Sequence, residues 1–304
     1  MKILIALSVL ILSGCGSNQA VTSSTMPVTF SGIEKQAVIT GSAGETSPFV
    51  FGGELYFVSY GRGSVDLSQG FVKIQHYPDL DTVSTFPFPY GYGSVLVDNG
   101  VIHLFASSES NPGNSIVTIS SSDMVTWSAP QTVFTAQPDQ TIYNTSPAKT
   151  ATGYVLTFET HQDGSDHGWF YDQFLTSPDL VSWTQTGGSY FKVGYDTETA
   201  CPLIRYVDGY YYLFQTQDNH AATGPRYTTQ VTRSTDLVNF EDSSITVLSS
   251  YPRTDEGNNN SDIDMIEYQG QLFITYGVGD QTTWGAMKWA TYNGTLEQFV
   301  KAFF

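Results

Sequence analysis

The sequence predicts an all-β fold, a five-bladed β-propeller built of four-stranded antiparallel blades. Helical periodicity is scarce, whereas short alternating runs rich in aromatic and β-branched residues recur along the chain. A unit of strand, glycine turn and strand occurs five times, and a second turn, which ends in an aromatic residue, follows these units. Four strands per unit at a period of about 50 residues is typical of propellers.

The first repeated feature is a hairpin whose turn carries a glycine. Its five copies are SPFVFGGELYFVSY (47–60), SVLVDNGVIHLFAS (94–107), SPAKTATGYVLTFE (146–159), CPLIRYVDGYYYLF (201–214) and DIDMIEYQGQLFITY (262–276). Glycine suits the turn because a tight hairpin requires positive φ, which other residues adopt only at a cost. An open two-sheet sandwich is the structural alternative, but it would leave the repeat unexplained.

The second repeated feature is an Asp-containing turn that we expect to join the third strand of a blade to the fourth. Clear copies are SSDMVTW (121–127), SPDLVSW (177–183) and STDLVNF (234–240), with weaker copies at YPDLDTV (77–83) and YNGTLEQF (292–299). The aromatic residue is expected to pack between sheets. The last unit leaves little room for an outer strand, so residues 28–40 are predicted to supply it and close the ring.

The amino-terminal segment is predicted to be a targeting signal rather than part of the folded domain. Residues 1–14 have the short apolar run of a signal peptide, too short to cross a bilayer as a helix. The run Leu12-Ser13-Gly14-Cys15 resembles a bacterial lipobox, which implies lipidation at Cys15; an ordinary signal peptide with a chance cysteine is the alternative. Residues 15–26 are then a lipidated tether and residues 27–304 the propeller domain, held at the cell envelope on the outer membrane or the periplasmic face of a bacterial membrane.

Charge and cysteine content limit the partners of the domain. The formal net charge of −17 disfavours binding to nucleic acid and to anionic lipid headgroups, so contact with a membrane is expected through the lipid anchor only. With Cys15 lipidated, Cys201 has no cysteine partner, and no disulfide is expected. We expect a monomer.

The loops are distributed unequally between the two faces of the predicted propeller. Turns within the repeated hairpins are short, whereas the loops expected on the other face are long and rich in charged and aromatic residues: 60–70, 107–115, 136–145, 160–171, 190–200, 215–228, 250–261 and 277–286. Long, chemically rich loops on one face of a rigid scaffold are where binding sites are usually built.

The G-x-Y-Y-L-F strands and S-x-D-L-V-x-W turns resemble the five-bladed glycoside hydrolases related to families 43 and 117, over nearly all of residues 27–304. This resemblance implies a glycoside hydrolase that acts on oligosaccharides or polysaccharide fragments with carboxylates in a central pocket. The alternative is a non-catalytic carbohydrate-binding surface lipoprotein. A protein-interaction propeller is a third class, for which a plainer loop face would be expected.

Glycosidic cleavage requires one carboxylic acid and one carboxylate. In the family-43 pattern such groups open the innermost strands, and here Glu45, Glu198 and Asp262 are the catalytic candidates. Glu45 and Asp262 each stand eight residues before their turn glycine. The pattern is not matched throughout, because Ala200 occupies the slot of the usual acid and Tyr92 stands where an aspartate would be expected. For each carboxylate a structural role, as a strand cap or a solvated loop acid, is the alternative.

Further residues are candidates for substrate binding. Histidines interest us because members resembling family 117 are thought to use a histidine as acid, and tryptophans because sugar rings pack on aromatic rings. The candidates are Asn144, Glu159, His161, Trp169, His220, Arg226 and Trp284, with Glu159 placed to orient His161. Asp264 could equally pair with an arginine such as Arg205. No cofactor is expected and no zinc-ligand spacing is present, although carboxylates and asparagines near 255–264 would suit a structural calcium ion.

Overall fold

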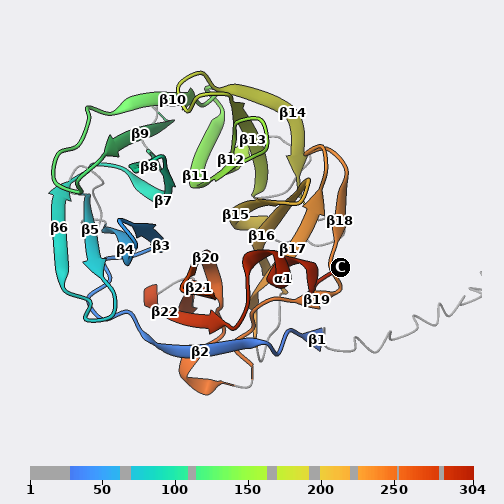
Figure 1. Ribbon diagram of the computed structural model, residues 1–304. Coiled ribbons are helices and arrows are strands. Elements are labelled where there is room, and N and C mark those ends of the chain that lie inside the picture. Colours follow the sequence, from blue (N-terminus) through green and yellow to red (C-terminus); the bar gives the residue numbers. More distant parts are fainter. Residues whose placement is uncertain are drawn as a thin grey trace, which may run out of the picture.

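The computed structural model describes residues 28–61, 70–108, 114–162, 170–191, 199–219, 225–251, 253–280 and 284–304. Five four-stranded antiparallel sheets surround a central axis, which confirms the predicted propeller (Figure 1). The innermost strands β3, β7, β11, β15 and β20 contact one another in sequence, and β20 contacts β3 again to complete the circle. Within the described residues no helix is long and apolar enough to cross a membrane.

The strands of blades one to four run outward from the axis in chain order, and in blade five the amino-terminal strand β2 takes the outermost place. Blade one contains β3 (Thr46–Phe51), β4 (Glu54–Gly61), β5 (Phe71–His76) and β6 (Thr82–Pro87), and blade two contains β7 (Gly91–Asp98), β8 (Val101–Ser107), β9 (Ser115–Ser121) and β10 (Gln131–Thr135). Blade three contains β11 (Gln140–Lys149), β12 (Tyr154–Gln162), β13 (Tyr171–Ser177) and β14 (Thr184–Tyr190), and blade four contains β15 (Thr199–Val207), β16 (Tyr210–Asp218), β17 (Tyr227–Ser234) and β18 (Phe240–Asp242). Blade five contains β20 (Ser261–Tyr268), β21 (Gln271–Gly279), β22 (Trp284–Tyr292) and β2 (Ile33–Val38).

The ring is closed by the amino-terminal strand, as the sequence predicts. Strand β2 pairs antiparallel with β22, with Ile33 opposite Tyr292, and forms the outer edge of blade five (Figure 1). Just before it, the short strand β1 (Val28–Thr29) pairs in parallel with β19 (Ile245–Thr246), which follows blade four. Strands from both ends of the chain therefore hold one blade together.

The segment at 292–299 differs from the prediction of a third-to-fourth strand turn. It leads into a helix, α1 (Leu296–Lys301), because Thr295 and Gln298 form a capping box. Phe299 of this helix is fully buried and packs against Phe30 and Phe214. No fourth strand is needed after β22 because β2 already occupies that edge.

The Asp-containing turns fold by local hydrogen bonds. The carboxylate of Asp123 accepts from the N–H groups of Val125 and Thr126 at 2.8 and 2.7 Å. Asp179 and Asp236 repeat this arrangement in the next two blades. The aromatic residue that ends each turn packs between sheets as expected, at centroid distances of 4.9 to 5.9 Å: Trp127 on Phe86, Trp183 on Phe105 and Phe240 on Phe174.

Each junction between neighbouring blades holds its own apolar cluster. Phe49 and Leu104 belong to the cluster between blades one and two, and Phe214 and Ile274 to the one between blades four and five. All four side chains are at most 2% exposed. Because the blades are joined by these wedge-shaped cores, the inner strands are held rigidly around the axis.

Candidate functional site

A pocket of about 240 Å³ lies at the axis, where the inner strands begin. Its walls come from all five blades, and a narrower hollow continues from it between the inner strands. Three of its carboxylates are Glu45, directly before β3, Glu159 on β12 and Asp262 on β20. Glu45 and Glu159 are buried, with 8% and 4% of their surfaces exposed.

Backbone irregularities at the start of the inner strands aim side chains at this pocket. The pairing register shifts near the beginning of β7, β11, β15 and β20. Within these bulges, Tyr92, Cys201 and Asp262 adopt positive φ angles of 55°, 52° and 51°. Non-glycine residues occupy this conformation at a cost, and bulges next to active sites commonly re-aim a side chain. All three residues line the pocket.

Asp262 is surrounded by hydrogen-bond donors. Asn144 on β11 donates to its Oδ1 at 3.5 Å, and the Ser261 hydroxyl donates to its Oδ2. Such a set of donors stabilises a negatively charged carboxylate. Cys201 lines the same pocket, and burial and the charge of Asp262 raise the pKa of its thiol.

Cys201 is a free cysteine that lies beside the pocket carboxylates, where its thiol is poorly suited to act as a nucleophile. Burial raises its pKa well above the ordinary value, and the charges of Asp262 and Glu159 raise it further. A thiol in this environment stays protonated and is a poor nucleophile. The backbone N–H of Cys201 donates to Oε2 of Glu159 at 2.6 Å.

An aromatic wall lies beside the carboxylates. Tyr92 meets Tyr143 edge-on at 5.5 Å, and Tyr143 meets Phe170 edge-on at 5.1 Å. All three rings line the pocket. Reasoning from sequence did not select Tyr143 or Phe170. Tyr143 is equivalent to Tyr92, Cys201 and Asp262, because each stands two residues before the residue at which regular pairing resumes, and only the strand pairing shows this equivalence.

The described residues contain several of the predicted site residues. Glu45, Asn144, Glu159 and Asp262 line one pocket, and Ala200 lines it as well. His161 lies nearby, with its ring 6.2 Å from that of Phe170. Three predicted residues lie outside the described part of the chain: Glu198, Trp169 and His220. So do residues 1–27, with Cys15.

Two of the predicted substrate-binding residues lie in surroundings other than those expected. Arg226 is not among the pocket residues; its guanidinium pairs with both carboxylate oxygens of Asp218 at 2.6 to 2.9 Å and lies over the ring of Tyr227. Trp284, expected in a loop, is the first residue of β22, because β21 and β22 extend further than predicted and pair Gly279 with Trp284. Nothing is described of its side chain.

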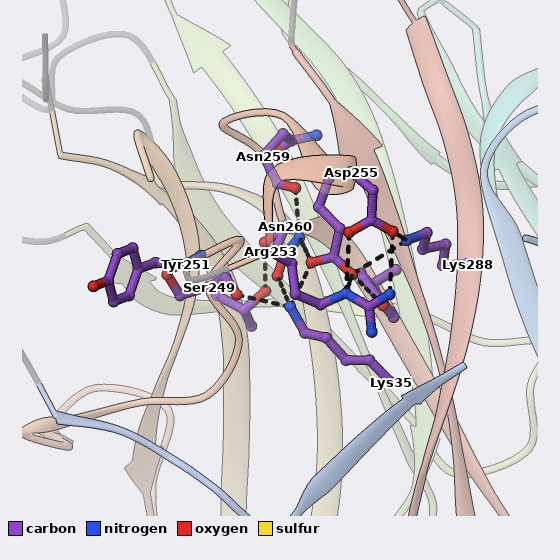
Figure 2. Close-up of polar contacts among 11 residues, drawn as sticks. Lys35, Ser249, Tyr251, Arg253, Asp255, Asn259, Asn260 and Lys288 are labelled. Atoms are coloured by element: carbon purple, nitrogen blue, oxygen red, sulfur yellow. Dashed lines mark hydrogen bonds and ion pairs between the residues drawn. The ribbon is translucent and has the colours of Figure 1, made fainter. Parts of the chain in front are cut away.

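The predicted calcium-binding segment holds an ammonium group instead. The Nζ of Lys35 on β2 donates to Glu256, Asn260 and the carbonyl of Ser249 at 2.5 to 2.7 Å. Lys288 on β22 donates to Asp255 at 2.6 Å, and Figure 2 shows both lysines reaching this segment. The oxygens proposed as calcium ligands are therefore used in ion pairs, which tie the segment before β20 to the outer strands of blade five. The arginine pairing considered for Asp264 is confirmed, since Arg205 donates to it.

The sequence matches no protein-family model and no curated protein. Its structure is similar to that of a family 62 α-L-arabinofuranosidase from Coprinopsis cinerea, with a TM-score of 0.60, 10% identity, and 88% of this chain and 98% of that chain covered. It is also similar to a family 43 endo-arabinanase from Bacillus licheniformis, with a TM-score of 0.55, 17% identity, and 84% of this chain and 94% of that chain covered. A protein of family 130, a family that contains mannoside phosphorylases and glycoside hydrolases, has a TM-score of 0.56 and 13% identity, with 86% of this chain and 84% of that chain covered. At these identities the likeness shows a shared fold.

Proposed function

We propose that this protein is a glycoside hydrolase that cleaves oligosaccharides or polysaccharide fragments in the axial pocket. The observation that carries the proposal is the convergence of Glu45, Glu159 and Asp262, from three blades, on one pocket with an aromatic wall. Glycosidic cleavage needs two carboxyl groups across the scissile bond. Aromatic rings supply the flat apolar surface on which a sugar ring packs.

The surroundings of the acids suggest a division of roles. Asp262, with Asn144 and Ser261 as donors, is suited to act as the nucleophile or general base. Glu45 is the second candidate for that role. Glu159, the most buried acid of the three, is the candidate for the carboxylic acid that protonates the leaving oxygen. Glu198, the other candidate acid, directly precedes β15.

A non-catalytic sugar-binding protein is the second candidate function. It is favoured by Ala200, which lines the pocket where the family-43 pattern places an acid. A hydrolase and a binding protein would share the aromatic wall and differ only in turnover.

We expect the purified protein to release products from members of a panel of neutral oligosaccharides. Asp262→Asn should lower turnover about 100-fold or more, because the amide cannot act as nucleophile or base. Its melting temperature should move by no more than about 3 °C, since the amide keeps the shape of the side chain. Chromatography of the released sugars measures turnover, and calorimetry measures the melting temperature. Binding of an oligosaccharide without cleavage by the wild type would identify a binding protein.

We also propose that the domain is carried at the cell envelope by a lipid on Cys15. The basis is the lipobox-like run at 12–15, which follows a short apolar segment. Cys15→Ser should move the protein from the membrane fraction to the soluble fraction, because the thiol that accepts the lipid is gone. Immunoblots of both fractions measure this, with Cys201→Ser as the matched control that should remain with membranes. Retention of Cys15→Ser on membranes would contradict the lipid anchor.

A further inference from the structure

Two consecutive residues at the start of β20 contact each other through their side chains. The hydroxyl of Ser261 donates to Oδ2 of the pocket residue Asp262. Side chains of consecutive residues in a regular strand point to opposite faces, so this contact requires an irregular backbone. The pairing register shifts between Ser261 and Asp264, and Asp262 has a φ of 51°. The bulge therefore turns the carboxylate of Asp262 back toward the hydroxyl beside it.

The direction of this hydrogen bond is set by Asn259. Nδ2 of Asn259 donates to Oγ of Ser261 at 3.0 Å. An amide nitrogen can only donate, so the Ser261 oxygen accepts this bond with a lone pair, and its own proton serves Oδ2 of Asp262. Asn259, Ser261 and Asp262 thus form a short chain of hydrogen bonds that runs toward the carboxylate.

This chain begins in a segment that neighbouring elements hold in place. Tyr227 on β17 donates its N–H to the carbonyl of Asn258 at 2.9 Å and accepts the N–H of Asn260 at 3.0 Å. The side chain of Asn260 donates to the carbonyl of Asn259 at 2.5 Å and accepts from Lys35, as Figure 2 shows. Because Asn259 is held on both sides and is 4% exposed, its amide is a fixed donor for Ser261.

Gly277 on β21 leaves the space that the carboxylate occupies. It lies opposite Ser261 in the β20–β21 pairing. A side chain at this position would place its Cβ 3.1 Å from Oδ2 of Asp262 and 3.2 Å from Oγ of Ser261. Contacts this close would displace one of the two groups, so the absence of a side chain at Gly277 allows the hydroxyl and the carboxylate to meet.

The two oxygens of Asp262 have different surroundings. Oδ2 accepts from the Ser261 hydroxyl, whereas Oδ1 lies 3.5 Å from Nδ2 of Asn144, a pocket residue on β11. Ser261 is 0% exposed, so it reaches a substrate only through Asp262. Oδ1 is therefore the oxygen that faces across the pocket.

We propose that Ser261 is a positioning residue, which holds Oδ2 of Asp262 so that Oδ1 is the oxygen that reacts. This inference rests on the proposed hydrolase function. A lone pair of Oδ1 forms the bond to the anomeric carbon if Asp262 is the nucleophile. If Asp262 is the general base, that lone pair takes a proton from the water whose oxygen forms this bond. In both cases the electron pair of the broken glycosidic bond stays on the leaving oxygen, which the general acid protonates.

The first test is Ser261→Ala, which removes the hydroxyl and keeps Asp262. We expect kcat on oligosaccharides to fall about 10-fold or more, because a carboxylate that can rotate is less often in the reactive orientation. KM should stay within about 3-fold of the wild-type value, since the variant removes no contact with the bound substrate. Ser243→Ala is the matched control. Ser243 is also buried and donates its hydroxyl to the carbonyl of Phe303, but it is not a pocket residue, so kcat should be that of the wild type.

The second test is neutron diffraction of the wild type, which locates the proton and needs neither turnover nor a variant. We expect a deuteron on Oγ of Ser261 that points to Oδ2 of Asp262. A crystal structure of Ser261→Ala should then show the carboxylate of Asp262 in more than one orientation. A deuteron directed elsewhere, or a wild-type carboxylate that does not contact Ser261, would overturn the proposal.

The kinetic outcomes separate this inference from the hydrolase proposal. An active wild type whose kcat is unchanged in Ser261→Ala would refute the positioning role and leave the hydrolase in place. Equal losses of kcat in Ser261→Ala and Ser243→Ala would reduce Ser261 to a structural role. A wild type with the expected deuteron and no activity on any oligosaccharide would refute the proposed function instead, and would leave only the anchored carboxylate.

Discussion

Replacing Glu256 with glutamine is expected to lower the free energy of unfolding by about 3–5 kcal/mol, the usual cost of removing one partner of a buried ion pair. Glu256 is fully buried, and Lys35 and Lys288 approach it from two strands at 2.5 and 3.5 Å. The amide removes the negative charge but leaves both ammonium groups buried. Denaturant unfolding followed by tryptophan fluorescence measures the loss.

The matched control lies one residue away. Asp255 pairs with Lys288 and Arg253, but its side chain is 55% exposed, so Asp255→Asn should cost no more than about 1 kcal/mol. The double variant of Lys35→Met with Glu256→Gln should recover part of the loss, since it removes the ammonium group that Glu256→Gln leaves without a carboxylate partner. Equal, small effects of Glu256→Gln and Asp255→Asn would show that the network does not hold the ring closed.

The same network predicts how stability depends on pH. Burial acts to raise the pKa of Glu256, but the hydrogen bond and charge of Lys35, with help from Asn260 and Tyr276, hold it below its ordinary value. The folded-state pKa of this group is therefore lower than its value in the unfolded chain, about 4.3. Its contribution is complete above that pH and is lost as the pH falls through the folded-state value. Glu256→Gln should flatten this acid limb of the stability curve.

The blade count was predictable because its signals are local. A hairpin glycine and an Asp turn each depend on a few neighbouring residues, and the turn at Asp123 forms from its own backbone N–H groups. Ring closure by residues 28–40 was predictable because the last unit lacks a strand. The helix α1 was missed because Thr295 and Gln298, which form its capping box, lie within a segment that also resembles the repeat.

The site was only partly predictable because it depends on contacts between distant strands. Glu45 and Asp262 could be found from their place before inner strands. Glu159 lies instead on a second strand, and only the bulge at Cys201 brings a backbone N–H to it.

The sharpest expected result at the site itself concerns Glu159→Gln. If Glu159 protonates the leaving oxygen, kcat/KM on oligosaccharides should fall by about 1,000-fold, within the range for loss of a general acid. Aryl glycosides with an acidic phenol as leaving group should keep activity within about 10-fold, because such a group departs without protonation. Glutamine retains an oxygen that can accept the N–H of Cys201, so the melting temperature should stay near that of the wild type.

Parallel kinetics on both substrate classes measure the difference, with Glu241→Gln, 62% exposed beside Arg233, as the control. Equal losses on both classes would mean that Glu159 only shapes the pocket, and an unchanged rate on oligosaccharides would move the acid role to Glu198 or a histidine.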